Sequence, residues 1–250
     1  MKHAVSSYIT RELKHKRALI FALIDSENTS PGLSESIARK IAAAGADAIL
    51  VGGSTAVDQL MLSSIIKRIK GAVTIPVILF PGNVTGVSPQ ADAILFASLL
   101  NSTDPYFIIG AQALGSYLVR KYKIEPLPTG YIIAGEGGAA GFIGRVHSFP
   151  QDKPELVALY ALAAEYLGMS FVYLEAGSGV SNNIPEKTIK TVRALYGGTL
   201  IVGGGIRSEE RARKVVQAGA DIIVVGNLIE TPRFEKTLKH IAFAVHNLKM

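Results

Sequence analysis

The sequence predicts an α/β fold, a (β/α)8 TIM barrel, from three observations. Eight short and nearly continuous apolar runs recur along the chain, which is typical of parallel strands buried on both faces. A segment with helical spacing follows almost every run, as in strands joined by crossover helices. The chain has 250 residues and no linker rich in Pro, Gly or Ser, and one such barrel needs about 250 residues. We therefore expect a single domain over residues 1–250.

The expected strands share short runs of Val, Ile, Leu and Ala. They are residues 18–25, 48–53, 74–81, 93–98, 130–135, 171–176, 200–204 and 222–226. The expected helices are residues 33–44, 56–70, 105–123, 153–167, 185–196, 208–218 and 232–248. We expect Ser34 and Ser208 to cap their helices, because a serine hydroxyl at a helix start accepts a hydrogen bond from a free backbone N–H.

The connection between the third and fourth strands departs from this pattern. Residues 82–92 contain two glycines and a proline, and the segment is too short and too rich in helix breakers for a crossover helix. We therefore expect a barrel that lacks a regular third helix. The gap is either an exposed apolar groove for a long apolar ligand, or a compact loop covered by neighbouring helices or by a partner subunit.

Two similar segments, residues 44–53 and 218–227, each place Ala-Gly-Ala-Asp before an apolar run and a glycine turn. Internal repeats of this kind are frequent in phosphate-binding barrels. Asp47 and Asp221 precede their strands, whereas catalytic groups of such barrels follow the strands. We therefore expect structural roles for both carboxylates.

Composition limits the classes of function. The chain has no cysteine, which excludes disulfides and thiolate chemistry. A net charge of +6 suits nucleic acid, anionic small molecules or a membrane surface, or simply a basic protein. The basic residues are scattered, so we expect no nucleic-acid binding. No apolar run approaches the ~20 residues of a membrane span, and no signal peptide is evident. We expect a cytoplasmic protein without a transmembrane segment.

Glycines at three successive strand ends predict a site for an anion. The sixth strand leads into Tyr-Leu-Glu-Ala-Gly-Ser-Gly at residues 173–179, and the next two end near Gly204, Gly205, Gly226 and Asn227. Backbone N–H groups at such turns bind phosphate in many barrels. Arg207 would add positive charge or would be a solvated residue at a helix start.

Two side chains of the sixth strand are candidates for catalysis. Glu175 faces the barrel mouth if Leu174 and Ala176 face outward, and Tyr173 then lies on the same side. Glu175 would hydrogen-bond a substrate hydroxyl or accept its proton. The alternative is a structural carboxylate bound to a loop amide.

Oxygen ligands at the ends of the first two strands suit a hard cation. Asp25 ends the first strand, and Ser54 and Thr55 follow the second. Mg²⁺ needs few protein ligands when substrate phosphates complete its shell. The alternative for Asp25 is a helix cap or an Asx-turn. Elsewhere, the glycine-rich segment 137–145, flanked by Glu136 and His147, is a candidate lid.

Together these motifs resemble the geranylgeranylglyceryl phosphate synthase family. The resemblance rests on residues 173–179, 202–207 and 225–227, on Asp25 and on the Gly-Gly-Ser at 52–54, and it extends to residues 101–112 and 128–133. It covers nearly the whole chain. Leu23 stands where the bacterial branch has a lysine, which favours the archaeal branch.

The resemblance implies a prenyltransferase of the first committed step of archaeal ether phospholipid synthesis. In this reaction the C3 hydroxyl of sn-glycerol 1-phosphate attacks geranylgeranyl diphosphate and releases diphosphate. The implied Mg²⁺ ligands are Asp25 and Ser54, with Thr55 as a substitute. The family is usually dimeric or larger, so we expect a homo-oligomer, and peripheral contact with a membrane stays open. The residues implied to bind glycerol 1-phosphate are Tyr173, Leu174, Glu175, Ala176, Gly177, Ser178, Gly179, Gly204, Gly205, Gly226 and Asn227.

Two other classes of function remain as alternatives. An isomerase or aldolase acting on sugar phosphates would need a lysine or paired aspartates at the strand ends, and neither is evident. A non-enzymatic module that binds nucleic acid or a membrane surface would cluster Lys and Arg among aromatic residues, whereas here they are scattered.

Overall fold

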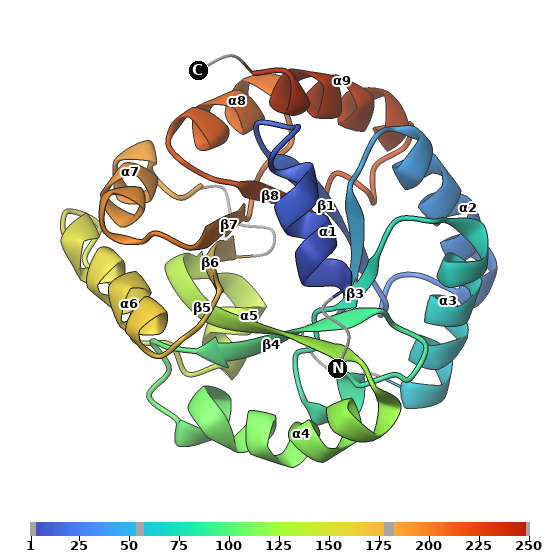
Figure 1. Ribbon diagram of the computed structural model, residues 1–250, viewed down its shortest axis with the longest axis horizontal. Coiled ribbons are helices and arrows are strands. Elements are labelled where there is room, and N and C mark those ends of the chain that lie inside the picture. The colour runs from blue at the N-terminus through green and yellow to red at the C-terminus, as the bar shows by residue number, and fades with distance from the viewer. Residues whose placement is uncertain (1–3, 54–57, 178–182, 249–250) are drawn as a thin grey trace.

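The computed structural model describes residues 4–53, 58–177 and 183–248. Within these ranges the chain forms a closed barrel of eight parallel strands in sequence order, with helices around its outside (Figure 1). The predicted (β/α)8 barrel is therefore confirmed. The strands are β1 (Leu19–Asp25), β2 (Ala48–Gly52), β3 (Val77–Leu79), β4 (Ala93–Leu99), β5 (Glu125–Gly137), β6 (Phe171–Gly177), β7 (Thr199–Gly203) and β8 (Ile222–Val225). The helices are α1 (Ala4–Glu12), α2 (Pro31–Ala43), α3 (Gln59–Ala72), α4 (Ala111–Tyr122), α5 (Gly138–Ile143), α6 (Pro154–Tyr166), α7 (Glu186–Leu195), α8 (Glu209–Gln217) and α9 (Phe234–His246).

Alternation along each strand divides the core into two layers. Side chains at every second position, such as Phe21, Leu50 and Tyr173, fill the barrel interior. Their neighbours, such as Ile49 and Leu174, pack between the barrel and the helices. Successive strand residues point to opposite faces, so runs that are apolar throughout fit both layers at once.

Helix α1 closes the barrel at the end where the strands begin (Figure 1). Val5 and Ile9 join the interior cluster, and the Glu125 carboxylate accepts hydrogen bonds from the N–H groups of Val5 (2.7 Å) and Ser6 (3.0 Å). A carboxylate there satisfies N–H groups that a helix start leaves free. This helix was not predicted from the sequence, because no strand precedes it to mark a repeat.

The third crossover helix is absent, as predicted. Between β3 and β4 the chain makes only a 3-10 turn, Val84–Gly86, which Asn83 caps by accepting a hydrogen bond from the N–H of Thr85 at 2.9 Å. The outer faces of β3 and β4 therefore lack the helix that covers the other strands. This gap gives access to the site described below.

Some local predictions were wrong. Ser30, not Ser34, occupies the cap position of α2, and Pro31 follows it. Ser34 is buried and donates to the carbonyl of Pro31 at 2.8 Å. Ser208 does cap α8, since its hydroxyl accepts a hydrogen bond from the N–H of Arg211 at 3.2 Å. The segment before α4 is a π-helical turn, Tyr106–Gly110, where one regular helix was expected.

Strand β5 begins at Glu125, five residues earlier than predicted. The prediction missed this start because it contains two prolines, which are rare in strands. Glu125 donates its N–H to Asp92 at the start of β4. Alternate residues of a strand direct their backbone groups to opposite neighbours, so Pro126 and Pro128 face β6. Pairing between β5 and β6 begins only at Thr129 of β5, so β6 has no backbone group beside these prolines. Proline costs little where a strand has no neighbour to receive an N–H.

Asp47 has the structural role predicted for it. Its carboxylate accepts hydrogen bonds from the Ile20 N–H (2.8 Å), Lys16 Nζ (2.5 Å) and His246 Nε2 (2.8 Å). It thereby ties β1 to the end of α9. Asp221 is similar, because it accepts from Arg193 (2.9 Å) and from the Leu200 N–H (2.8 Å).

We expect Asp47→Asn to lower the free energy of unfolding by about 2 kcal/mol at pH 7, as for lost hydrogen bonds to a charge. Burial alone would raise the pKa of Asp47, but His246 and Lys16 lower it below its ordinary value. A lowered pKa gives stability above the unfolded value of about 3.9 and loses it as the pH falls through the folded pKa. Urea unfolding at pH 7 and near pH 3 measures this, and the difference between the two proteins should shrink at the lower pH. The exposed Asp152→Asn is the control, and equal midpoints of Asp47→Asn and wild type at pH 7 would contradict the role.

Candidate active site

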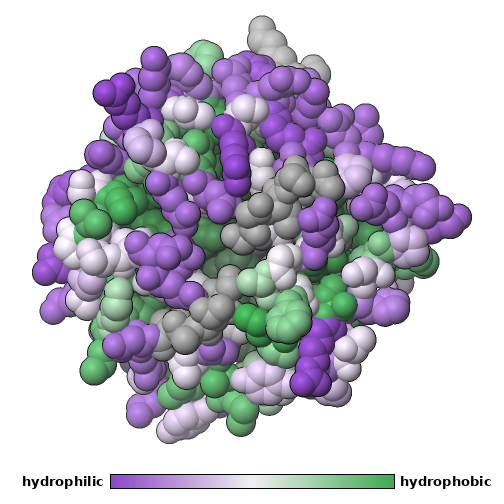
Figure 2. Space-filling model, turned by 180° about the vertical axis from the view of Figure 1, so that it is seen from behind, coloured by the Kyte–Doolittle hydropathy of each residue, from purple (hydrophilic) through white to green (hydrophobic). Residues whose placement is uncertain are grey.

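Two adjoining cavities open where the strands end. The larger has a volume of about 210 Å³ and the smaller about 70 Å³. Leu23, Asp25 and Glu175 line both. Figure 2 shows this face, opposite to the view of Figure 1, with a hollow near its centre. The two carboxylates therefore stand at the junction of two spaces of different size.

The smaller cavity is lined by backbone from β6, β7 and β8. Gly177, Gly204, Gly205, Gly226 and Asn227 all border it. Gly204 and Gly205 have positive φ angles of 90° and 69°, which favour glycine. A Cβ on Gly204 would lie 2.6 Å from the Ala176 Cβ and 2.7 Å from Glu175 Oε1. Only bare backbone fits here, and bare backbone exposes N–H groups to an anion.

Glu175 is fixed by two hydrogen bonds at the end of β6. Its Oε1 accepts from the Gly177 N–H at 2.6 Å, and its Oε2 accepts from the Tyr173 hydroxyl at 2.9 Å. Burial raises the pKa of Glu175, while these two hydrogen bonds oppose that rise. The carboxylate is bound to a loop amide, as the structural alternative required, and it also faces both cavities.

Aromatic rings separate the two cavities beneath Glu175. The Tyr173 ring stacks on Phe80 at 5.3 Å between centroids and meets Tyr131 edge to face at 5.2 Å. Phe80 and Tyr131 line the larger cavity, and Tyr173 lines the smaller. Tyr173 thus lies on the same side of β6 as Glu175, as expected.

Asp25 makes the Asx-turn considered as its alternative role. Its carboxylate accepts from the Glu27 N–H (2.8 Å) and from Asn28 Nδ2 (3.2 Å). Burial, followed by repulsion from Glu27 and Glu230, raises the pKa of Asp25. Within residues 4–53, 58–177 and 183–248, no three His, Asp or Glu side chains cluster as a metal site. Asp25 and Glu175 are the two carboxylates that line both cavities.

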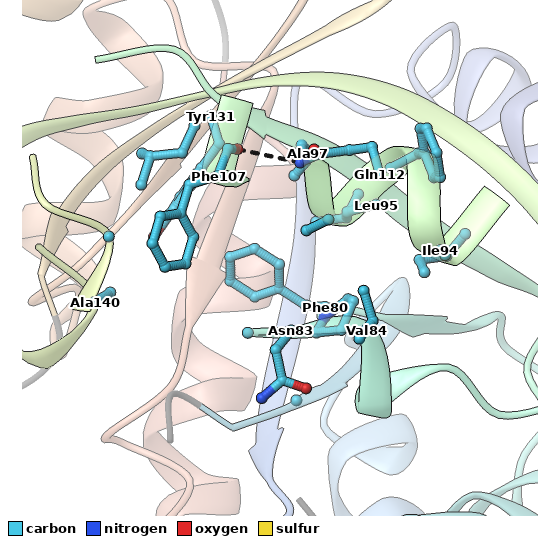
Figure 3. Close-up of a pocket in the computed structure, with 18 of the residues that line it drawn as sticks. Phe80, Asn83, Val84, Ile94, Leu95, Ala97, Phe107, Gln112, Tyr131 and Ala140 are labelled. Atoms are coloured by element: carbon cyan, nitrogen blue, oxygen red, sulfur yellow. Dashed lines mark hydrogen bonds between the residues drawn. The ribbon is translucent and has the colours of Figure 1, made fainter. Parts of the chain in front are cut away.

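The larger cavity runs from this junction to the gap left by the missing helix. Phe80, Val84, Leu95, Ala97, Phe107 and Gln112 surround it (Figure 3). The sequence left an exposed groove and a compact covered loop as alternatives, and the structure shows the groove. Asp25 and Glu175 were singled out from the sequence, but the apolar lining was not, because it comes from segments around β3, β4 and α4 that meet only in the fold. The apolar side chains near the uncovered strand ends were the available signal.

The glycine-rich segment after β5 is a short helix rather than a loop. Helix α5 is fastened to the end of β4: Ser102 donates to the carbonyl of Gly144 (2.6 Å), and Thr103 donates to that of Arg145 (2.9 Å). Asn101 donates to the carbonyl of His147 at 3.0 Å. Ala140 and Ile143 line the larger cavity. The segment expected as a lid forms one wall of the groove.

Comparison with known proteins identifies the family. A model of the PcrB family matches residues 11–245. The geranylgeranylglyceryl phosphate synthase of Nitrosopumilus maritimus (strain SCM1) is 50% identical over 245 residues, 98% of each chain. The chain belongs to the PcrB family. Its resemblance to geranylgeranylglyceryl phosphate synthases, predicted from the motifs, is confirmed.

A second relative and a solved structure agree with this assignment. The geranylgeranylglyceryl phosphate synthase of Pyrococcus furiosus is 51% identical over 227 residues, 91% of this chain and 90% of that one. A crystal structure of the Thermoplasma acidophilum enzyme, in complex with its substrate sn-glycerol-1-phosphate, has a TM-score of 0.93 at 35% identity. It covers 99% of this chain and 100% of that one.

The PcrB-family fold brings together most of the predicted site residues. Tyr173, Glu175, Gly177 and the four residues at the ends of β7 and β8 border the smaller cavity. The side chains of Leu174 and Ala176 point away from it, into the layer beneath the helices. Ser54, Thr55, Ser178 and Gly179 lie outside the described residues. Arg207, Ile206 and Glu230 also border the smaller cavity, and only Arg207 was singled out from the sequence.

We expect Glu175→Gln to be at least as stable as the wild type at pH 8. Because burial raises its pKa, ionisation of Glu175 opposes folding above the unfolded value of about 4.3. The amide avoids this cost, and the gain should vanish as the pH falls toward about 4.3. Melting temperatures across this range measure the effect, with the exposed Glu155→Gln as control. A lower melting temperature of Glu175→Gln at pH 8 would show that the ionised carboxylate stabilises the fold.

Proposed function

We propose that the chain joins the C3 hydroxyl of sn-glycerol 1-phosphate to C1 of geranylgeranyl diphosphate and releases diphosphate. The observation that carries this function is the junction of two unlike cavities at one buried carboxylate. One cavity is small and lined by glycine backbone, and the other is long and apolar. A reaction between a small phosphate ester and a long apolar donor needs both spaces to meet where the bond forms.

The acceptor occupies the smaller cavity. Gly204, Gly205, Gly226 and Asn227 hold its phosphate through backbone N–H groups, which suit an anion. The glycerol hydroxyls then lie toward Glu175 at the junction. In its ionised form Glu175 orients the C3 hydroxyl and accepts its proton.

The donor extends its apolar tail along the larger cavity, with its diphosphate near Asp25. The bond between C1 and the diphosphate oxygen breaks, and its electron pair leaves with diphosphate. The C3 oxygen forms the new bond to C1 and gives its proton to Glu175. The rings of Phe80, Tyr131 and Tyr173 exclude water, which would otherwise capture the allylic carbon.

We propose Mg²⁺ as the cofactor. Asp25 fits it, because a half-buried carboxylate that lines both cavities supplies the kind of oxygen ligand Mg²⁺ takes beside substrate phosphates and water. Ser54 would be a second protein ligand. When bound, the ion would stabilise the negative charge of the leaving diphosphate.

We further propose a homo-oligomer in the cytoplasm that binds no nucleic acid. Large apolar side chains on the outer faces of α4 and α6 are exposed, among them Leu114, Tyr117, Leu159 and Tyr166. Exposed apolar area of this extent marks a contact surface, and a second copy of the chain would cover it. No helix of the described residues is both long and apolar enough to span a bilayer, so any membrane contact of this enzyme would be peripheral.

The decisive experiment is incubation with labelled sn-glycerol 1-phosphate, Mg²⁺ and prenyl diphosphates of several lengths. An ether product that depends on both substrates supports the function. No ether product with any donor would overturn it. The rival aldolase chemistry has little support, because in the described part of the chain no lysine lines either cavity.

We expect Glu175→Ala to lower kcat more than tenfold. The hydroxyl loses the group that orients it and takes its proton, and effects of about 100-fold are typical for general bases. In the wild type, kcat should also fall on the acid side as Glu175 becomes protonated, at a pH above that of an ordinary glutamate. Steady-state rates from pH 5 to 8 measure both effects. Turnover of Glu175→Ala near the wild-type rate would remove the residue from the mechanism.

We expect Gly115→Leu to discriminate between donors. Gly115 lines the larger cavity from α4, and a Cβ there would meet nothing within 4 Å. The Cβ of a leucine there would therefore meet no neighbour, and the rest of the side chain would extend into the groove. KM for the C20 donor should rise about tenfold, since each displaced CH₂ costs about 0.8 kcal/mol, while KM for a C10 donor and for the acceptor should not change. If the wild type and Gly115→Leu had equal KM values for the C20 donor, the donor tail would have to lie elsewhere.

A further inference from the structure

We infer that Asn183 is a positioning residue for the acceptor phosphate. It lies on the segment between β6 and α7, beside the loop that follows β7. With its carboxamide oriented so that donors face acceptors, Nδ2 of Asn183 donates to the carbonyl oxygens of Gly204 and Gly205, at 3.1 Å each. One side chain thereby fixes two successive peptide groups at the edge of the smaller cavity.

The direction of those peptide groups gives Asn183 its function. In a trans peptide the N–H points opposite to the C=O, and the structure has no cis peptide among the described residues. The N–H groups of Gly205 and Ile206 therefore point away from Asn183. Both residues line the smaller cavity, and two adjacent N–H groups facing the same way form an anion-binding concavity. Within the described ranges neither N–H donates to an acceptor of the protein.

Glycine alone would not hold this arrangement. Gly204 and Gly205 both lie in the left-handed region, which glycine enters and leaves at little cost. Asn183 supplies the restraint by direct contact, because a Cβ placed on Gly205 would overlap only the Asn183 carboxamide. Without this side chain the two peptide groups are free to rotate, and the phosphate would have to order them on binding.

The residues that follow Asn183 are anchored to α8, the helix that follows the glycines. Arg211 of α8 donates through Nη2 to the carbonyl of Ile184 at 2.5 Å, and its Nη1 lies 3.7 Å from the Glu186 carboxylate. The β6–α7 segment is thus held from α8, while Asn183 holds the loop that leads into α8. This closed set of contacts keeps the carboxamide opposite the two carbonyls.

The test uses Asn183→Ala and Asn183→Asp in the full-length chain. The first removes both donors, and the second also directs a carboxylate at two carbonyl oxygens. Asn247→Asp is the matched control, because Asn247 is exposed at the C-terminal end of α9 and bonds only within its helix. The measurements are the Kd for inorganic phosphate by calorimetry, the KM of each substrate, kcat and the melting temperature.

For Asn183→Ala we expect the Kd for phosphate and the KM for sn-glycerol 1-phosphate to rise about tenfold, as for one to two lost hydrogen bonds. The KM for the prenyl donor and kcat should stay within about twofold. Asn183→Asp should bind phosphate more weakly still, and Asn247→Asp should bind it as the wild type does. An unchanged phosphate Kd in Asn183→Ala would overturn the inference, as would equal losses for both substrates together with a lower melting temperature. The expected change in KM for sn-glycerol 1-phosphate rests on the proposed function, whereas the expected change in the Kd for inorganic phosphate does not. A wild type that forms no ether would therefore overturn the proposed function and leave the role of Asn183 standing.

Discussion

The hydrogen bond from the Gly177 N–H to Glu175 fixes the point where the two cavities meet. At 2.6 Å it holds a carboxylate that burial would otherwise protonate or displace. The Gly177 backbone has a φ of 120°, and a Cβ there would strike the backbone of Gly137. Glycine is therefore required so that β5 and β6 can approach closely, and that approach directs the amide at the carboxylate. The orientation of Glu175 toward both cavities depends on this contact.

The absent third helix is the second constraint. In a complete barrel a crossover helix would cover the outer faces of β3 and β4. Here Ile94 and Phe96 on the outer face of β4 border the larger cavity instead. The barrel closes without this helix because the turn after β3 is compact and capped by Asn83. In the proposed reaction the prenyl tail would lie in this gap, and each CH₂ buried there would contribute about 0.8 kcal/mol.

Sequence patterns predicted the strands, turns and site residues that depend on residues close together in the chain. Apolar runs marked six of the eight strands to within one residue at each end, whereas β3 covers only Val77–Leu79 of the expected 74–81. The breakers at 82–92 predicted the missing helix. The start of β5 was missed because Pro126 and Pro128 have no backbone N–H and so disfavour a strand, except where no neighbouring strand would receive one. Whether a neighbour is present is a property of the whole sheet. Strand-end motifs indicated Glu175 and the glycines for the same local reason. The groove lining and the role of Asn183 depend on contacts between segments far apart in sequence, and no local pattern encodes them.

In the proposed reaction, the burial of Glu175 has two opposite effects. It would exclude water from the allylic carbon, yet it raises the pKa of the group proposed to take the proton. The hydrogen bonds from Gly177 and Tyr173 oppose that rise, because both donors favour the charged form. A raised pKa also makes the carboxylate a stronger base once ionised. The position at the end of β6 thus combines a dry site with the base that the proposed reaction needs, provided that both donors stay in place.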